Sequence, residues 1–216
     1  MTLQLIIQQL LSGLGTSLYI FILTLAFSLP LGLLVSFGRM SKITPLRGFM
    51  KVYISILRGT PLMLQLFVVY FGPYYIFGKQ ITPSYRLTAV IIGFVLNYAA
   101  YFAEIFRSGI ESMPQGQYEA AEVLGYTKRQ TFFKIIFPQV IKRILPPITN
   151  ETITLVKDTS LAFSIAVAEM FTVAKALAAA QRSMIPFAAA GIFYYIFNFI
   201  VAFAMEKIEK RLSYYK

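Results

Sequence analysis

Carboxylates inside apolar segments are the side chains of this chain whose type and position could do chemistry. Only nine acidic residues occur among 216. A charge near the centre of a bilayer costs roughly 2.5–3.5 kcal/mol on insertion scales, so such residues usually face a cavity or a partner. Only Lys157 opposes them within the apolar segments, which leaves a formal excess of three negative charges. The four acids concerned are Glu104, Glu151, Asp158 and Glu169.

Helical spacing arranges the polar residues of these segments into two faces. Residues three or four positions apart lie on one side of a helix. One face has intervals of four, three and four residues and comprises Asn97, Tyr101, Glu104 and Ser108. The other has intervals of seven and eleven and comprises Glu151, Asp158 and Glu169. The pattern predicts two polar walls along a path through the membrane.

We expect four of these residues to contact a substrate. The carboxylates would hold an ammonium group, and their excess favours a cationic side chain. Two alternatives stay open: Lys157 pairs with one of the acids, or Asp158 joins neighbouring helices. Glu151 is expected at the membrane surface instead. The predicted substrate-contacting residues are Asn97, Tyr101, Glu104 and Asp158.

The elements that must position these residues are membrane helices. Hydrophobic residues make up 57% of the chain and charged residues 13%, and the mean hydropathy is +0.67. Apolar runs of about 20 residues recur, which is the length that crosses a hydrocarbon core. We predict an all-α integral membrane protein with one transmembrane domain over 1–216, and an interfacial helix over 1–13. The five predicted spans are 15–38, 59–78, 84–107, 147–173 and 184–205.

The distribution of basic residues predicts the orientation. Fifteen of the 20 lysines and arginines lie in three segments, 39–58, 107–143 and 207–216. Because cytoplasmic loops are enriched in Lys and Arg, we expect the N-terminus outside and the C-terminus in the cytoplasm. The net charge of +11 is then a topology signal, and nucleic acid is not an expected partner.

Several kinds of chemistry are excluded by composition. The chain has neither Cys nor His, so disulfides and thiolate or imidazole metal ligands are absent. We therefore predict no metal site and no catalytic residue. No G-x-x-x-x-G-K-[ST] loop occurs, so the chain does not bind ATP in that manner.

The segment between the third and fourth spans carries a resemblance. It contains Glu119, Ala120 and Ala121, then Gly125 after three residues, and finally Ile135, Phe137 and Pro138. This is similar to the EAA motif of membrane subunits of ABC importers, E-A-A-x3-G-x9-I-x-L-P, with Phe137 in place of leucine. Three further segments resemble the polar amino-acid uptake branch: R-G-T-P-L at 58–62, A-E-I-F-R-S-G-I at 103–110 and K-D-T-S-L at 157–161.

The resemblance implies a multi-pass permease of a prokaryotic inner membrane, which is not itself an enzyme. Two such subunits would form the pathway, homodimeric or with a similar sibling. A cytoplasmic ABC ATPase dimer would bind ATP and Mg and drive it, and an external solute-binding protein would deliver the amino acid. The chain itself would bind no cofactor.

The motif would form a short cytoplasmic coupling helix. Gly125 is suited to end that helix, because glycine adopts the left-handed C-cap conformation at little cost. Pro138 would interrupt or kink the helix that follows. The residues expected to couple to the ATPase are Glu119, Ala120, Ala121, Gly125 and Pro138.

A proton-coupled secondary amino-acid transporter is the alternative function. In that case Glu104 and Asp158 would relay protons across the membrane. Buried carboxylates fit this possibility, whereas the odd number of spans does not favour two inverted halves.

Overall fold

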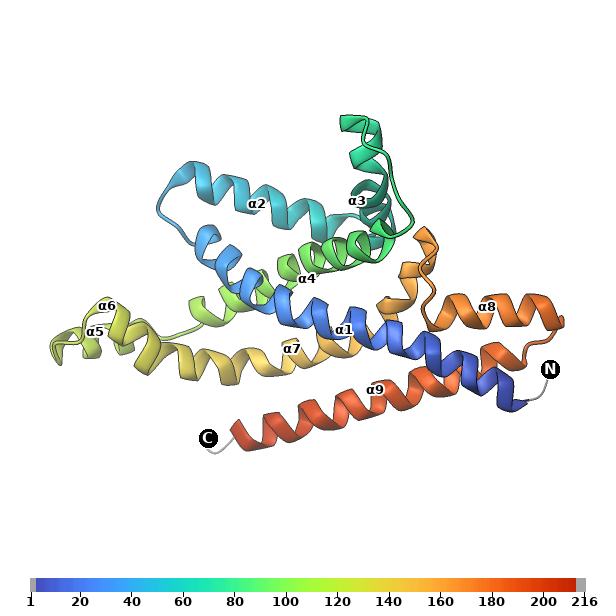
Figure 1. Ribbon diagram of the computed structural model, residues 1–216. Coiled ribbons are helices and arrows are strands. Elements are labelled where there is room, and N and C mark those ends of the chain that lie inside the picture. The colour runs from blue at the N-terminus through green and yellow to red at the C-terminus, as the bar shows by residue number, and fades with distance from the viewer. Residues whose placement is uncertain (1–2, 213–216) are drawn as a thin grey trace.

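The protein is all-helical over residues 3–212, which are the residues that the computed structural model describes (Figure 1). Its α-helices are joined by one π-helical and one 3₁₀-helical segment. In chain order the elements are α1 (Leu3–Arg39), α2 (Thr44–Gly59), α3 (Leu62–Phe77), α4 (Tyr85–Glu111), α5 (Gln115–Val123), α6 (Lys128–Gln130), the π-helical Thr131–Ile136, α7 (Phe137–Asp158), the 3₁₀-helical Thr159–Ile165, α8 (Met170–Gln181) and α9 (Ile185–Leu212).

Three helices, α1, α4 and α9, are each long and apolar enough to cross a membrane. Two further spans arise if each bent pair counts as one: α2 with α3, bent by 112°, and Lys128–Ile165 with α8, bent by 59°. The number of spans is thus three to five, compared with the five predicted. The α1–α2 turn, α5 and α6, and the end of α9 lie at one end of the molecule, and the start of α1 lies at the other (Figure 1).

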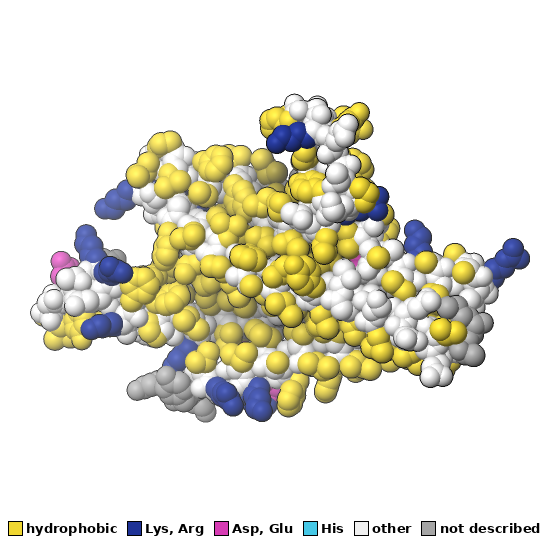
Figure 2. Space-filling model, in the orientation of Figure 1, with side chains coloured by type: hydrophobic (Ala, Val, Ile, Leu, Met, Phe, Trp, Pro, Cys, Tyr) yellow, Lys and Arg dark blue, Asp and Glu magenta, His cyan; other side chains and the backbone are white. Residues whose placement is uncertain are grey.

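The outer surface of the helices is apolar along most of their length. Figure 2 shows hydrophobic side chains over the middle of the molecule, while lysines and arginines lie at its ends and at the protruding tip of α3. Among the exposed large side chains, Val68, Phe199 and Phe203 are 67%, 61% and 59% exposed. Such a surface is stable only against lipid or another apolar surface.

Helix α1 corrects the expectation of a separate interfacial helix over 1–13. Residues from Leu3 onward continue directly into the first span, while residues 1–2 lie outside the described part of the chain. The reason is tertiary packing: Ile6 and Leu10 are buried against α8 and α9. A Cβ on Gly13 would lie only 2.7 Å from the Cα of Met170, so glycine permits this close approach.

Helix α2 and the bend after it also differ from expectation. The segment 39–58 was predicted to be a connection, but Thr44–Gly59 is helical and buries only Ile54 among its side chains. The chain then turns sharply into α3. Pro61 is the cause, because it has no N–H to bond to the Leu57 carbonyl and so cannot continue α2.

The fourth span begins earlier than predicted and is broken. The helix α7 starts at Phe137 instead of 147, and the 3₁₀ segment ends at Ala166, which adopts a left-handed conformation with φ 58°. A new helix, α8, starts after Glu169. The predicted fifth span, 184–205, is confirmed as the main part of α9.

Helix α4 lies at the centre of the core. Its Phe94, Tyr98 and Phe102 are at most 1% exposed and belong to the main hydrophobic core. The helix packs along α1 for much of its length and crosses α7 (Figure 1). Residues on the α7 side of α4 are therefore held rigidly, which is the condition for a defined site.

Candidate functional site

Two adjoining cavities lie where α4, α7 and the α2–α3 bend meet. The first, called the Asp158 cavity here, has a volume of about 440 Å³. The second, called the Glu104 cavity, has a volume of about 300 Å³. Tyr101 and Glu151 line both of them. Three of the four predicted substrate residues, Asn97, Tyr101 and Asp158, line the first cavity, and Glu104 lines the second together with Tyr101.

The Asp158 cavity is acidic. Its two charged lining residues are both carboxylates, Glu151 and Asp158, and none of the described residues that line it is basic. Asp158 accepts a hydrogen bond from the Tyr98 hydroxyl at 2.7 Å. This bond orients the carboxylate, and it realises the alternative in which Asp158 joins neighbouring helices. Tyr98 was not among the predicted site residues because it is not part of the predicted polar face; its ring belongs to the core.

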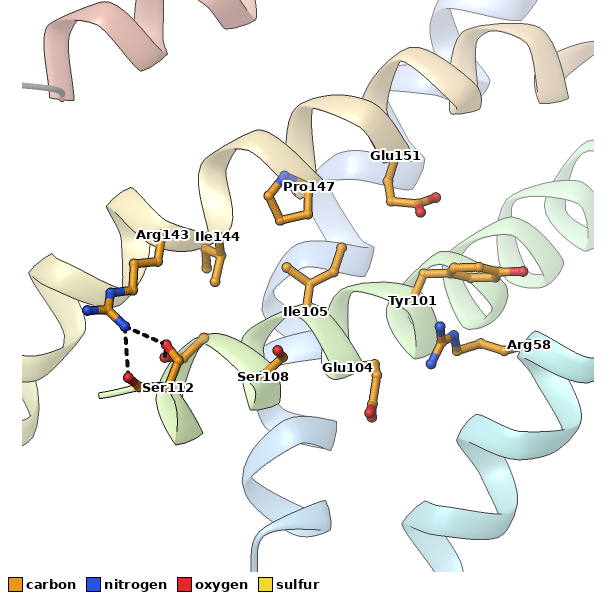
Figure 3. A pocket seen from close by; sticks show the side chains of 11 residues that line it. Arg58, Tyr101, Glu104, Ile105, Ser108, Ser112, Arg143, Ile144, Pro147 and Glu151 are labelled. Atoms are coloured by element: carbon orange, nitrogen blue, oxygen red, sulfur yellow. Dashed lines mark hydrogen bonds between the residues drawn. The ribbon is translucent and has the colours of Figure 1, made fainter. Parts of the chain in front are cut away.

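Glu151, which was expected at the membrane surface, lines both cavities. That expectation followed from starting the span at 147, which placed Glu151 one turn from the helix end. Because α7 starts at Phe137, Glu151 lies well inside the helix and its side chain points toward α4 (Figure 3). The seven-residue interval to Asp158 had already placed both residues on one helix face.

The Glu104 cavity has compensated charge. Glu104 forms a salt bridge with Arg107, which also bonds to Glu111. Arg143 donates to the Ser112 carbonyl oxygen at 2.7 Å and lies at the other end of the cavity (Figure 3). The predicted excess of three negative charges was therefore overestimated, since arginines from the helix ends reach into the cavity. Of the two cavities, only the Asp158 cavity has carboxylates, those of Glu151 and Asp158, without a basic residue among its described lining.

Asn97 holds the bend between α2 and α3. Its Nδ2 donates to the Leu57 carbonyl oxygen at 3.0 Å and to Gln65 Oε1 at 2.9 Å. Gln65 Nε2 donates to the same Leu57 oxygen at 2.9 Å and to the Thr60 carbonyl at 3.0 Å. These amides satisfy the carbonyl that Pro61 leaves without a helical partner. The Asn97 side chain is only 5% exposed although it lines the Asp158 cavity.

Tyr101 carries a basic neighbour that sequence spacing did not reveal. The guanidinium carbon of Arg58 lies 5.3 Å from the centroid of its ring. In Figure 3 the ring lies between the Arg58 guanidinium and the Glu151 carboxylate. Arg58 comes from the last turn of α2, and Glu151 from α7. The ring of Tyr101 thus stands where the two cavities join.

Glu169 does not belong to the predicted polar face. It is the N-cap of α8: its carboxylate accepts bonds from the backbone N–H groups of Phe171 and Thr172 at 2.6 and 2.7 Å. Tyr194 of α9 donates to it at 3.1 Å. The eleven-residue spacing failed because the helix is interrupted before Glu169. Its role in the structure is to fix the start of α8.

The loop predicted to couple to an ATPase has the expected helix. The helix α5 contains Glu119, Ala120 and Ala121, of which only Ala121 is buried. Gly125 has φ 77° and donates to the Glu122 carbonyl at 2.9 Å, while Tyr126 donates to that of Ala121 at 3.0 Å. This pair of bonds is a Schellman ending, so the predicted role of Gly125 as the helix stop is confirmed.

The tip of this loop exposes apolar side chains. Val123 and Leu124 are 87% and 74% exposed. The base is tied to α7, because Gln117 and Gln139 exchange two side-chain hydrogen bonds of 3.0 and 2.8 Å. Partial burial also raises the pKa of Tyr118 above its ordinary value. The helix is therefore anchored on one side and free to contact another surface on the other.

Pro138 lies in the first turn of α7, directly after the π-helical segment. In that segment the Phe137 N–H bonds to the Phe132 carbonyl, one residue further back than in an α-helix. The wider turn is the interruption that the proline was predicted to cause. The π-helical segment contacts α5, α6 and α7, which connects the three helices.

The chain matches the family model described as "binding-protein-dependent transport system inner membrane component" over residues 28–214. The L-cystine transport system permease protein TcyB of Bacillus subtilis is 38% identical over 201 residues, which are 90% of this chain and 82% of that protein. The arginine transport system permease protein ArtQ of the same organism is 35% identical over 205 residues, 94% of this chain and 92% of that protein.

Solved structures show the same fold. An amino acid ABC transporter crystallised with histidines has a chain that is 31% identical, with a TM-score of 0.85 and coverage of 94% of both chains. The MetNI methionine ABC transporter in an inward-facing conformation is 17% identical with a TM-score of 0.73, which supports the fold alone. Family, relatives and fold agree with the resemblance carried by the loop. The chain belongs to the inner membrane components of binding-protein-dependent transport systems, the multi-pass bacterial permeases of ABC transporters whose ATPase is a separate subunit.

Proposed function

We propose that this chain is the permease subunit of an ATP-driven importer for polar amino acids with a cationic side chain. The observation that carries the proposal is the acidic lining of the Asp158 cavity. Helix α7 contributes the carboxylates of Glu151 and Asp158, and none of the described lining residues is basic. A carboxylate pair of this kind binds ammonium and guanidinium groups through charge-assisted hydrogen bonds. The names of the relatives include cystine, arginine and glutamine, so the relatives do not single out one substrate class. The proposed class rests instead on the acidic lining of the cavity.

The substrate path runs from the Asp158 cavity to the Glu104 cavity along α4 and α7. In this proposal Asp158 and Glu151 contact the cationic group, and Tyr101 forms the passage between the cavities. Glu104 lines the second cavity with its charge compensated by Arg107, so it contributes shape and polarity. Asn97 contributes chiefly by holding the α2–α3 bend.

The complex contains this chain as one transmembrane domain over 1–216, paired with a second permease subunit. Its N-terminus is outside and its C-terminus is cytoplasmic, as the positive segments predict. An ABC ATPase dimer binds ATP and Mg and contacts Glu119, Ala120 and the exposed Leu124 at the tip of α5. An external solute-binding protein delivers the amino acid. Movement of the ATPase reaches the path through α5 and the Gln117–Gln139 pair.

A proton-coupled transporter is the weaker proposal. A proton relay needs a carboxylate that exchanges its proton readily, whereas Glu104 is held by Arg107. Asp158 remains as the only candidate of the two predicted relay residues. Family membership also assigns the energy source to a separate ATPase.

The test is uptake into vesicles that contain the chain with its ATPase subunit. We expect arginine uptake to require ATP in the ATPase compartment and the solute-binding protein outside. Asp158→Asn should lower the affinity for arginine about tenfold, since a bond to a charged group contributes about 1.5–3 kcal/mol. Glu104→Gln should change it less. Uptake driven by a proton gradient with this chain alone would contradict the proposal, as would wild-type arginine affinity in both variants.

A further inference from the structure

The Arg58 guanidinium stands over the Tyr101 ring inside the Glu104 cavity. We propose that Arg58 is a resident cation: it occupies the position that a cationic substrate side chain takes at Tyr101, and the substrate must displace it to pass between the cavities. This inference rests on the proposed function, because it assumes that the cavities carry substrate. It assigns to Arg58 a role in selecting between cationic and neutral amino acids.

Arg58 differs from the other arginines around the cavity in what holds it. Arg107 is held by two carboxylates, and Arg143 is held by Ser112. For Arg58 the structure shows contact with the Tyr101 ring, and within residues 3–212 it forms no salt bridge. Its side chain is exposed. The guanidinium is held by this ring and, without an ion pair among the described residues, by the charges of Glu104 and Glu151 at longer range. Displacing it costs little when a cationic substrate takes its place beside the same ring and carboxylates.

The surroundings of Arg58 are those that recognise a free guanidinium. An aromatic face and nearby carboxylates bind arginine by stacking and charge. The ring is that of Tyr101, and the carboxylates lining the same cavity are those of Glu104 and Glu151. Figure 3 shows Arg58 entering from α2, while the ring and both carboxylates come from α4 and α7. A substrate guanidinium that reaches the ring therefore meets the Arg58 guanidinium there.

The backbone beside Arg58 is fixed, so the side chain can leave without movement of its helix. Leu57, the preceding residue, accepts hydrogen bonds from Asn97 and Gln65. Thr60 is held by Gln65 through its carbonyl and hydroxyl oxygens. Rotation about side-chain bonds is then the only change required to clear the ring. Such rotations are fast compared with a transport cycle.

Because Arg58 is charged, its substitution should change the affinity for arginine relative to that for glutamine in a predictable direction. While the guanidinium is at the ring, it offsets the field of Glu104 and Glu151 and repels a second cation. A neutral amino acid of similar polarity, such as glutamine, does not feel this repulsion. Removing the charge should therefore favour arginine over glutamine, whereas a purely structural Arg58 would affect both alike.

The experiment measures equilibrium binding of radiolabelled arginine and glutamine to the purified permease–ATPase complex without the binding protein. We expect Arg58→Gln to raise the affinity for arginine more than about twofold and up to about thirtyfold, the range of one cation–π contact, and to leave the affinity for glutamine within about twofold. Arg58→Lys keeps the charge and should stay near wild type. Lys51→Gln removes one charge from the same helix, but Lys51 lines neither cavity. The ratio of the arginine affinity to the glutamine affinity should therefore be the same in this variant as in wild type.

A second substitution tests the location. In a variant that already carries Glu151→Gln, the gain in arginine affinity from Arg58→Gln should be smaller, because the carboxylate that would hold the incoming cation is gone. The inference is overturned if Arg58→Gln leaves arginine affinity unchanged or lowers it, if arginine and glutamine gain equally, or if Lys51→Gln has the same effect. Failure of the proposed function is distinct: it appears as wild-type uptake that needs no ATP or as insensitivity to Asp158→Asn.

Discussion

The Tyr98 hydroxyl lies 2.7 Å from Asp158 Oδ2 and donates a hydrogen bond to it, which joins α4 to α7 at the wall of the Asp158 cavity. Tyr98 is 1% exposed, and its ring stacks with that of Phe94 at 6.3 Å. The donor is thus fixed by core packing. The bond uses one of the two carboxylate oxygens, so Asp158 has both a structural contact and a face toward the cavity.

The substitution Tyr98→Phe separates these two roles. It removes the hydroxyl and keeps the ring and the Asp158 charge. We expect the complex to lose about 1.5–3 kcal/mol of stability, the contribution of a bond to a charged group, while preferring arginine over glutamine as before. Thermal melting and the ratio of the two uptake rates measure this. A lost arginine preference at unchanged melting temperature would mean that the hydroxyl itself contacts substrate.

Gly13→Ala tests whether the first turns of α1 are part of the packed structure. The new Cβ would lie 2.7 Å from the Met170 Cα and 2.9 Å from its nitrogen, so α1 must move away from α8. We expect a loss of about 1–3 kcal/mol, the usual cost of overpacking, seen as a lower melting temperature and less assembled complex.

Gly15→Ala is the matched control, because no atom lies within 4 Å of the point that its new methyl group would occupy. It should leave stability unchanged or raise it by about 1 kcal/mol through helix propensity. Equal behaviour of the two variants would contradict the close approach of α1 and α8.

Gly125→Ala should damage the transmission of movement from the ATPase. At φ 77° an alanine is strained by about 1–2 kcal/mol, so the end of α5 frays and its tip loses a fixed direction. We expect ATP hydrolysis to continue with less amino acid transported per ATP. Gly116→Ala, within the same helix and with open space around it, should retain the wild-type ratio. A normal ratio for Gly125→Ala would show that the Schellman ending is dispensable.

Asn97→Leu distinguishes a residue that positions the bend from one that binds substrate. The change removes two hydrogen bonds and leaves the Leu57 carbonyl with the Gln65 donor alone. We expect a cost of about 1–3 kcal/mol for the weakened buried network and a similar fall in arginine and glutamine uptake. Loss of arginine uptake alone, at an unchanged melting temperature, would instead establish the direct substrate contact predicted from the sequence.

The loop with Glu119 and Gly125 was predictable because its structure is local. A run of helix formers followed by a glycine specifies a short helix and its left-handed end, whatever surrounds it. The apolar runs that became α4 and α9 were predictable for a similar reason, since length and hydropathy suffice. The interval of four residues from Asn97 to Tyr101 likewise placed both beside the same cavity.

The errors arose where tertiary contacts decide the structure. The break before Glu169 was missed: its carboxylate caps α8 through the nearby N–H groups of Phe171 and Thr172, and Tyr194 of α9, which is distant in the sequence, also donates to it. Arg58 was assigned to a connection because the segment 39–58 was not expected to be helical. It stands in the last turn of α2, and the packing of α2 on α4 brings its guanidinium to Tyr101. The charge balance in the Glu104 cavity was misjudged for a similar reason. Arginines were assigned to the connecting segments, although the side chains of Arg58 and Arg143 extend into the cavity.

The bend between α2 and α3 has a consequence for the order in which the protein assembles. One of the two amides that satisfy the Leu57 carbonyl, Gln65, is available as soon as α3 exists. The other, Asn97, lies 40 residues after Leu57, on α4. Until α4 has been synthesised and has entered the bilayer, the corner is only partly bonded. The corner between α2 and α3 therefore reaches its final shape only after α4 has begun to insert.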